Sequence, residues 1–106
     1  MNGEQKEIDV QPIAEMFRLL GDPTRLRILL ACLDAPHSVG EIAARAGASQ
    51  SLASHHLRLL RNARLVKGTR DARQIFYQAA DQHVRRMLAN VIEHSAEDYT
   101  TADVTA

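Results

Sequence analysis

The stretch SVGEIAARAGASQSLASHHLRLLRNA, residues 38–63, decides the fold of this chain. Ser38 is followed three residues later by Glu41, and this capping-box pattern predicts that a short helix begins here. Gly47 predicts a tight turn, and Ser49 is suited to cap a second helix. Two short helices joined by a turn of about three to four residues that contains glycine form a helix-turn-helix.

The second of these helices, expected over residues 50–63, has two different sides. Leucines recur on the side that we expect to face the core, and they are Leu52, Leu57 and Leu60. The outward side carries short hydrogen-bonding groups near the start of the helix, where DNA-reading helices meet base edges and phosphates. These candidate DNA contacts are Gln50, Ser51, Ser54, His55 and Arg58. The alternative is an ordinary helical hairpin with a polar surface.

Two β-type runs follow, LVKGT at 65–69 and RQIFYQA at 73–79. A basic hairpin directly after a helix-turn-helix is a wing, and its cations are placed to meet phosphates or a minor groove. The candidate contacts on the wing are Lys67, Arg70 and Arg73. Tight hairpins favour glycine or asparagine where φ is positive, so Ala72 leaves a longer loop at the tip as an alternative.

Two more helices are expected before this region. The first, over 10–20, places Ile13, Met16, Phe17 and Leu20 on one side and ends at Gly21. Asp22 and Pro23 then suit the start of a helix over 24–33, with Leu26, Leu29, Leu30 and Leu33 facing the core. The predicted fold is therefore mainly α with a small β-hairpin, a winged helix-turn-helix whose terminal helices form a dimer.

The length of 106 residues suits one domain, which we divide into a flexible tail at 1–9, a winged-helix and dimerisation domain at 10–97 and a second flexible tail at 98–106. The sequence has neither an apolar run of about 18 residues nor a signal-peptide pattern, so we expect a cytoplasmic protein without membrane contact. The single cysteine, Cys32, lies in an apolar run and is expected to be a buried thiol without a disulfide partner.

The formal net charge is zero, but the charge is unevenly distributed. Residues 58–73 contain six basic side chains and one acid, Asp71. A local basic zone in a neutral chain favours a specific nucleic-acid face over a general affinity for polyanions. A solvated charged surface is the alternative interpretation.

The last predicted helix, DQHVRRMLANVIEHSAE at 81–97, carries four potential metal ligands at its two ends. Asp81 and His83 lie at the start, and His94 and Glu97 lie at the finish. At a rise of about 1.5 Å per residue the two histidines are about 16 Å apart, so one ion cannot join both ends of one helix.

An antiparallel second copy solves this problem, because the start of one helix then lies opposite the finish of the other. Both ligand pairs agree on a two-fold axis near Leu88 and Ala89, and a helical stripe around Val84, Leu88, Val91 and Ser95 supplies apolar packing. Asp81 and His83 would point about 200° apart within an ideal helix, so Asp81 has to lie at the helix boundary. In the alternative interpretation, Asp81 is only the N-cap of the helix, and His83 and His94 are half-exposed polar residues that bind no metal.

Several of these motifs together resemble the ArsR/SmtB family of metal-sensing winged-helix repressors. The resemblance covers about residues 13–97 and rests on GDPTRLRILL at 21–30, SQSLASHHLRLLRNARLV at 49–66 and the wing. The D-x-H and H-x-x-E pair, separated by ten residues, resembles the family's interhelical zinc-sensing site. The resemblance names as ligands Asp81, His83, His94 and Glu97, and as recognition contacts Gln50, Ser51, Ser54 and His55.

The same resemblance implies an allosteric link in which metal-bound His94 donates a hydrogen bond to the main chain near Arg64. It also places a second, thiolate site of the family at positions that are Ser38, Val39 and Gly40 here, so arsenic, cadmium or lead sensing by that route is not expected.

The expected function is metal-responsive repression of transcription. A metal-free homodimer binds an inverted-repeat operator, and Zn(II), with Co(II) as a mimic, releases it. A regulator of the same fold that responds to a non-metal signal is the first alternative. A metallohydrolase is not expected, because catalytic zinc keeps an open position and no additional base is evident. A zinc buffer would need neither the helix-turn-helix nor the wing.

Overall fold

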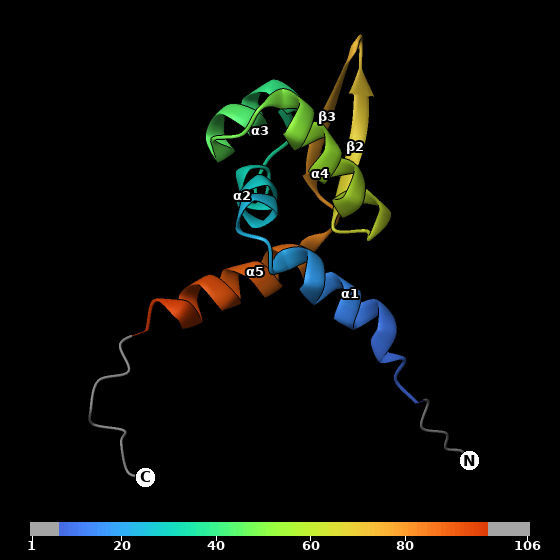
Figure 1. Cartoon of the computed structure of the whole chain (residues 1–106), viewed down its shortest axis with the longest axis vertical. Helices are drawn as coiled ribbons and strands as arrows, with labels where there is room; N and C mark the ends of the chain where they lie inside the picture. The colour runs from blue at the N-terminus through green and yellow to red at the C-terminus, as the bar shows by residue number, and fades with distance from the viewer. Residues whose placement is uncertain (1–6, 98–106) are drawn as a thin grey trace.

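The computed structural model describes residues 7–97 and confirms a winged helix-turn-helix. The elements are α1 (Val10–Leu20), α2 (Pro23–Ala31), β1 (His37–Ser38), α3 (Val39–Ala46), α4 (Gln50–Asn62), β2 (Val66–Asp71), β3 (Gln74–Ala79) and α5 (Gln82–Ser95). Figure 1 shows a body made of α2, α3, α4 and the sheet, from which α1 and α5 diverge as two arms. The second helix ends two residues earlier than expected, and the last spans 82–95 rather than 81–97. The predicted tail at 98–106 and most of the tail at 1–9 lie outside the described residues.

The predicted helix caps are present. The backbone N–H of Glu41 donates to Ser38 Oγ over 3.3 Å, and the Ser38 N–H donates to Glu41 Oε1 over 3.0 Å, which completes the capping box. Gly47 ends α3 with a φ of +69°, a conformation that glycine adopts without strain. Ser49 Oγ accepts from the N–H of Leu52 over 3.1 Å at the start of α4. These local bonds fix the turn between α3 and α4.

The sheet has three strands in the order β1-β3-β2, all antiparallel, rather than the hairpin alone. The additional strand pairs His37 with Tyr77 and Ser38 with Phe76. It is only two residues long, so it has no side-chain alternation that a sequence pattern could reveal. Its pairing ties the start of α3 to the central strand of the sheet.

The turn of the wing is tight. Asp71 pairs with Gln74, so Ala72 and Arg73 alone form the loop, and the longer loop considered from the sequence is wrong. Ala72 has a φ of +58°, in the left-handed region where a Cβ atom is unfavourable. The wing therefore stores backbone strain at its tip.

Replacing Ala72 by Gly is expected to raise the free energy of unfolding by about 1 kcal/mol, because glycine adopts positive φ without a Cβ clash. The matched control is Ala44→Gly, the same change at an exposed position inside α3, which should lower that free energy by about 1 kcal/mol. Urea unfolding of both variants at one protein concentration measures the two signs. A loss of stability in Ala72→Gly would contradict the strained turn.

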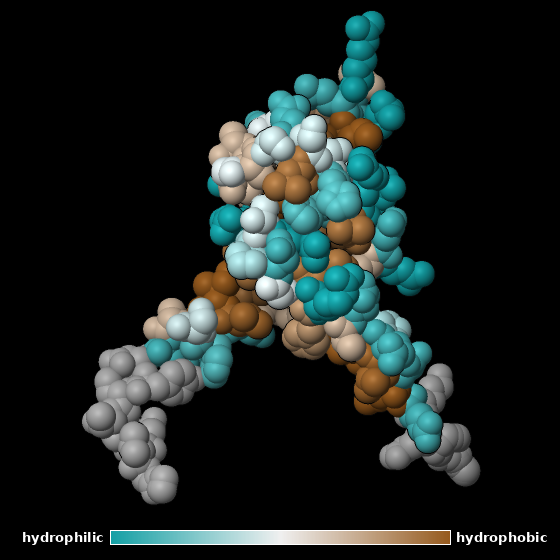
Figure 2. Space-filling view, in the orientation of Figure 1, coloured by the Kyte–Doolittle hydropathy of each residue, from teal (hydrophilic) through white to brown (hydrophobic). Residues whose placement is uncertain are grey.

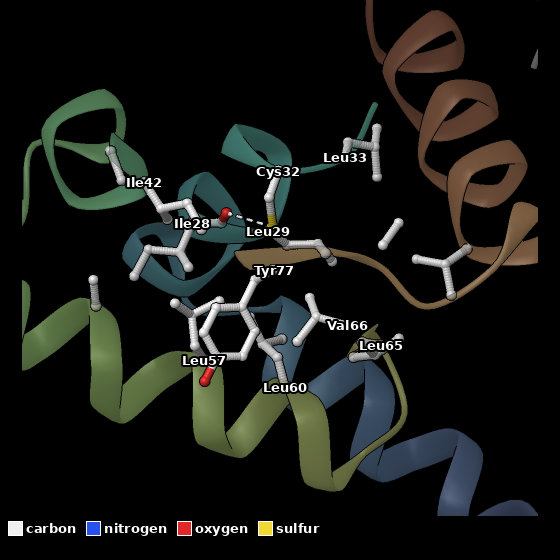
Figure 3. Close-up of a cluster of buried hydrophobic side chains, with 14 of the residues drawn as sticks. Ile28, Leu29, Cys32, Leu33, Ile42, Leu57, Leu60, Leu65, Val66 and Tyr77 are labelled. Carbon is white, nitrogen blue, oxygen red and sulfur yellow. Dashed lines mark hydrogen bonds between the residues drawn. The ribbon is translucent and has the colours of Figure 1, made fainter. Parts of the chain in front are cut away.

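The core lies between α2, α4 and β3. Figure 3 shows Leu57 and Leu60 of α4 meeting Tyr77 of β3, with Ile28 and Leu29 of α2 on the opposite side. Cys32 is fully buried as expected, its thiol donates to the carbonyl of Ile28 over 3.6 Å, and burial raises its pKa to about 12. The apolar side chains of the core that are fully buried or nearly so include Ile28, Leu29, Ile42, Leu57, Leu60 and Leu65.

Two leucines that the sequence pattern placed inward are partly exposed instead. Leu30 is 36% exposed and Leu52 is 41% exposed, whereas their neighbours Ile28 and Ala53 are fully buried. Other predicted inward leucines, Leu29, Leu57 and Leu60, are fully buried, so the predicted phase of both helices holds, and Leu30 and Leu52 lie at the edge of the buried side. The leucine spacing alone does not mark this edge, because small residues such as Ala53 also fill the inner side where helices approach closely.

Helices α2 and α3 cap each other. The Arg27 guanidinium on α2 donates to the carbonyl of Ala46 at the end of α3 over 3.3 Å, and Arg45 on α3 donates to the carbonyl of Ala31 at the end of α2 over 3.4 Å. Carbonyls at the last turn of a helix have no partner within the helix, so each arginine satisfies one such group. This exchange holds the first helix of the helix-turn-helix against α2.

The two arms expose apolar residues. On α1, Met16 and Leu20 are partly buried, but Phe17 is 64% exposed and Ile13 is 43% exposed. On α5 the expected stripe is divided: Val84 and Leu88 are buried in the body, whereas Val91 is 53% exposed. Figure 2 shows apolar surface on both arms. Among residues 7–97, no helix is long and apolar enough to cross a membrane.

Candidate DNA-binding face and metal site

The outward side of α4 carries the expected polar residues. Gln50, Ser51, His55 and Arg58 are exposed, and Ser54 is half-buried. The Arg58 guanidinium donates to Ser54 Oγ over 3.3 Å, which orients it along the helix. This face is therefore free of the core and rich in donors, as a helix that enters a DNA groove requires.

The three cations of the wing are all exposed, but they do not share one face. Lys67 and Arg70 are three residues apart on β2 and leave opposite faces of the strand. Gly68 lies on the face of Arg70, and a Cβ there would lie 3.0 Å from Cε1 of Tyr77, the residue packed against α4. Arg70 therefore projects on the side of the recognition helix, Lys67 projects on the other side, and Arg73 lies in the turn.

Asp81 and His83 meet at the start of α5. Asp81 is the N-cap, as its predicted place at the helix boundary requires, and its Oδ1 accepts from the N–H of Val84 over 3.0 Å. His83 Nδ1 lies 3.6 Å from the same Oδ1. The backbone hydrogen bond from Val84 and then the charge of His83 hold the pKa of Asp81 below its usual range. Both side chains are more than half exposed.

His94 and Glu97 lie at the other end of α5. His94 lies in the last turn and Glu97 follows the helix, where its N–H donates to the carbonyl of His94 over 3.2 Å. Within residues 7–97, no three His, Cys, Asp or Glu side chains gather as a metal-binding group. One chain thus brings Asp81 near His83 and places His94 and Glu97 at the opposite end of a 14-residue helix.

Arg64 follows the end of α4 with a φ of +64°, and its N–H donates to the carbonyl of Arg61 over 2.9 Å. The next residue, Leu65, joins two parts of the chain through its main chain. Its N–H donates to the carbonyl of Leu60 over 2.8 Å, and its carbonyl accepts from the N–H of Ala80 over 3.0 Å. The end of the recognition helix is thereby connected to the residue that precedes Asp81.

A polar pair beneath the recognition helix, buried His56 and half-buried Arg25, was not predicted from the sequence. His56 on α4 is only 8% exposed, and its Nδ1 accepts from Nε of Arg25 on α2 over 3.2 Å. The two residues are 31 positions apart, so no local spacing relates them. The one available signal was that His56 falls on the inner side of a helix whose outer side is polar.

The fold and the face of α4 define a winged-helix transcriptional regulator. Residues 22–67 match the family model described as "Bacterial regulatory protein, arsR family". The chain is 41% identical over 87 residues to the "Transcriptional repressor SmtB homolog" of Synechocystis sp., a match that covers 82% of this chain and 66% of that protein. It is 40% identical over 87 residues to the "HTH-type transcriptional regulator CmtR" of Mycobacterium tuberculosis, covering 82% and 74%.

The fold of this chain is also similar to the folds of solved structures. The NMR structure of the cadmium metal-sensor CMTR from Mycobacterium tuberculosis has a TM-score of 0.67 and 39% identity, and the match covers 88% of this chain and 97% of that one. HlyU from Vibrio cholerae has a TM-score of 0.76 and 29% identity, with 87% and 100% covered. The chain therefore belongs to the ArsR family, whose members are DNA-binding transcriptional regulators and not enzymes.

Proposed function

We propose that this protein is a metal-responsive transcriptional repressor. The metal-free homodimer binds an inverted-repeat operator, and Zn(II), or Co(II) in its place, releases the DNA when it binds between two α5 helices. The observation that carries the proposal is the placement of Asp81 with His83 at one end of α5 and of His94 with Glu97 at the other.

The exposed apolar residues of the two arms support the dimer. Val10, Ile13 and Phe17 recur on one side of α1, and Val91 and Ile92 are about half exposed on α5. Isolated exposed apolar residues are common, but a stripe on α1 together with two exposed apolar side chains on α5 favours burial against a partner. A two-fold axis pairs the same surface of both copies, so these residues suit a self-complementary interface.

The donor set fits zinc. Two imidazole nitrogens and two carboxylates are ligands that Zn(II) takes in four-coordinate geometry, and Co(II) accepts the same set. If two α5 helices cross antiparallel near Ala89, each end of the pair gathers Asp81 and His83 from one copy with His94 and Glu97 from the other. This arrangement gives one ion per chain and requires both copies at each site.

The recognition helix and wing support the DNA-binding part. In a dimer the two α4 helices enter successive major grooves, with half-sites about 34 Å apart. Gln50, Ser51, Ser54, His55 and Arg58 contact bases and phosphates, and Arg70, Arg73 and Lys67 contact the backbone from the wing.

One observed connection supports communication between the metal and the DNA, and we propose a second. The main-chain bonds of Leu65 join the end of α4 to the start of α5, next to Asp81. The proposed second connection is a hydrogen bond that metal-bound His94 would donate to the main chain near Arg64. A dimer locked by metal into a spacing that does not match the grooves releases the operator, and by linkage the operator weakens metal binding by the same factor.

A regulator of the same fold with a non-metal signal is the second candidate. The observation that favours it is the N-cap bond of Asp81, because a carboxylate that caps a helix needs no metal to explain its position. The two candidates differ in what zinc does to the DNA complex.

Zinc is expected to weaken operator binding by the wild-type protein by about tenfold to a hundredfold, at one ion per chain. The measurement is fluorescence anisotropy of a DNA fragment from upstream of its own gene, titrated with zinc. His83→Ala and His94→Ala should bind the metal-free operator normally and ignore zinc, because each removes one ligand from each site.

A further ligand variant and one control sharpen this test. Asp81→Asn keeps a side chain that caps helices but removes the carboxylate, so it should lose zinc response without losing α5. His37→Ala removes a histidine from β1, outside α5, and should respond like wild type. A wild-type protein that binds the operator unchanged in zinc, or equal zinc affinity with and without DNA, contradicts metal-driven release.

A further inference from the structure

One arginine joins the recognition helix to the end of the first arm. Arg25 Nε donates to His56 Nδ1 on α4 over 3.2 Å, and a second nitrogen of the same guanidinium donates to the carbonyl of Leu19 on α1 over 3.2 Å. Asp22 accepts from the backbone N–H of Arg25 over 2.8 Å and so fixes its place in the first turn of α2. A planar guanidinium holds two partners in a fixed geometry, which the single ammonium of a lysine does not.

The bond to His56 requires a neutral imidazole, because Nδ1 accepts a hydrogen bond only without its proton. The groups that face this ring are Arg25 on α2, Asp22 before α2 and His55 on α4. Burial, followed by the charges of Arg25 and His55, lowers the pKa of His56, whereas the charge of Asp22 opposes that shift. The ring is thus held in the form that accepts from Arg25.

We propose that Arg25 is a positioning residue for DNA recognition, which fixes the recognition helix relative to α1 through His56 and is released when His56 takes up a proton. The inference rests on the proposed DNA-binding function. The affinity for an operator with two half-sites depends on the distance between the two recognition helices of the dimer. That distance changes with the angle of α4 relative to the dimer arms. A single half-site does not test that distance.

Protonation of His56 removes its hydrogen bond with Arg25. Because the folded pKa of His56 lies below its usual value of 6.5, the bond is fully present above that pH and is lost as pH falls through the folded pKa. The proton on Nδ1 turns the acceptor into a donor and places a second positive charge opposite the Arg25 guanidinium. The operator complex should therefore weaken in mild acid.

The first experiment compares a full operator with a single half-site. The operator is the footprinted segment of the DNA upstream of its own gene, and binding is measured by anisotropy in metal chelator. Arg25→Lys keeps the charge but not the two-partner geometry, and should lower the ratio of full-operator to half-site affinity by about tenfold. An unchanged helical circular dichroism spectrum shows that the variant is folded.

The second experiment follows the operator affinity with pH. The operator affinity of wild type should fall by up to about tenfold between about pH 7.5 and about pH 5.5. The limit is about tenfold because pH 5.5 lies about one unit below the usual pKa of histidine, and each unit changes an equilibrium by about that factor. His56→Gln retains an oxygen that accepts from Arg25 and does not titrate, so its affinity at pH 7.5 should stay close to wild type and its pH profile should be flatter. His37→Gln changes a histidine of the same body that contacts Glu41 instead, and should keep the wild-type profile.

The outcomes separate this inference from the proposed function. If wild type shows no preference for the operator at pH 7.5, the DNA-binding proposal itself fails. If wild type binds but Arg25→Lys keeps the full-to-half-site ratio, or His56→Gln keeps the wild-type pH profile, the positioning role of Arg25 is wrong. A merely structural role would lower the thermal stability of Arg25→Lys and leave both readouts unchanged.

Discussion

Replacing Phe17 by Glu is expected to convert the proposed dimer into folded monomers and to weaken operator binding by at least about a hundredfold. Phe17 is 64% exposed and lies with Val10 and Ile13 on the apolar side of α1. A carboxylate buried in that interface loses its hydration without gaining a partner, which costs several kcal/mol. A monomer then engages one half-site and loses the affinity that comes from two linked contacts.

The measurement combines sedimentation equilibrium with anisotropy of the full operator. Gln11→Glu is the matched control, because it adds the same carboxylate to an exposed position in the first turn of α1, where a negative charge is favourable. It should remain dimeric and bind normally. A dimeric Phe17→Glu variant with wild-type affinity would place the interface elsewhere and remove one support of the shared metal site.

The local signals in this sequence were reliable because each acts within a few residues. Ser38 with Glu41, Gly47 and Ser49 each determine a cap or turn through their own backbone bonds, and all are observed. The same holds for Asp81, whose angle relative to His83 placed it at the boundary of α5. These positions are sufficient to order the helices of a helix-turn-helix.

Features that depend on tertiary packing were not predictable in the same way. The strand β1 exists only because His37 meets Tyr77 across the sheet, and the pair of Arg25 and His56 exists only because α2 packs on α4. The stripe on α5 has the right helical spacing, but the body buries Val84 and Leu88 and leaves Val91 exposed. Periodicity shows that a face is apolar, and does not show which neighbour covers it.

In the candidate metal site, too, the local positions of the residues were predictable and the assembly of the whole site was not. Spacing predicted which residues lie at each end of α5, and the structure brings Asp81 near His83 as expected. The joining of the two ends depends on a second copy of the chain. A single chain therefore shows Asp81 near His83, and the complete site depends on the proposed antiparallel crossing.

Two leucines on the recognition helix give the strongest test of the observed helical phase. Leu57 is fully buried on the inner side of α4, whereas Leu52 is 41% exposed although its spacing predicted that it faces the core. Leu57→Ala should lower the free energy of unfolding by about 3 kcal/mol, because it removes buried methyl groups and leaves a cavity among close-packed neighbours. Leu52→Ala should cost less than about 1 kcal/mol, because water already reaches that side chain and alanine favours the helix.

Urea unfolding at one fixed protein concentration measures both values, since the stability of a dimer depends on concentration. The two variants carry the same chemical change five positions apart on one helix, so helix propensity cancels in the comparison. Equal losses would mean that Leu52 is covered in solution, and that the buried side of α4 is wider than the single chain shows. In that case the outward face that carries Gln50, Ser54 and Arg58 would be narrower, and the residues next to Leu52 would be removed from the assigned DNA contacts.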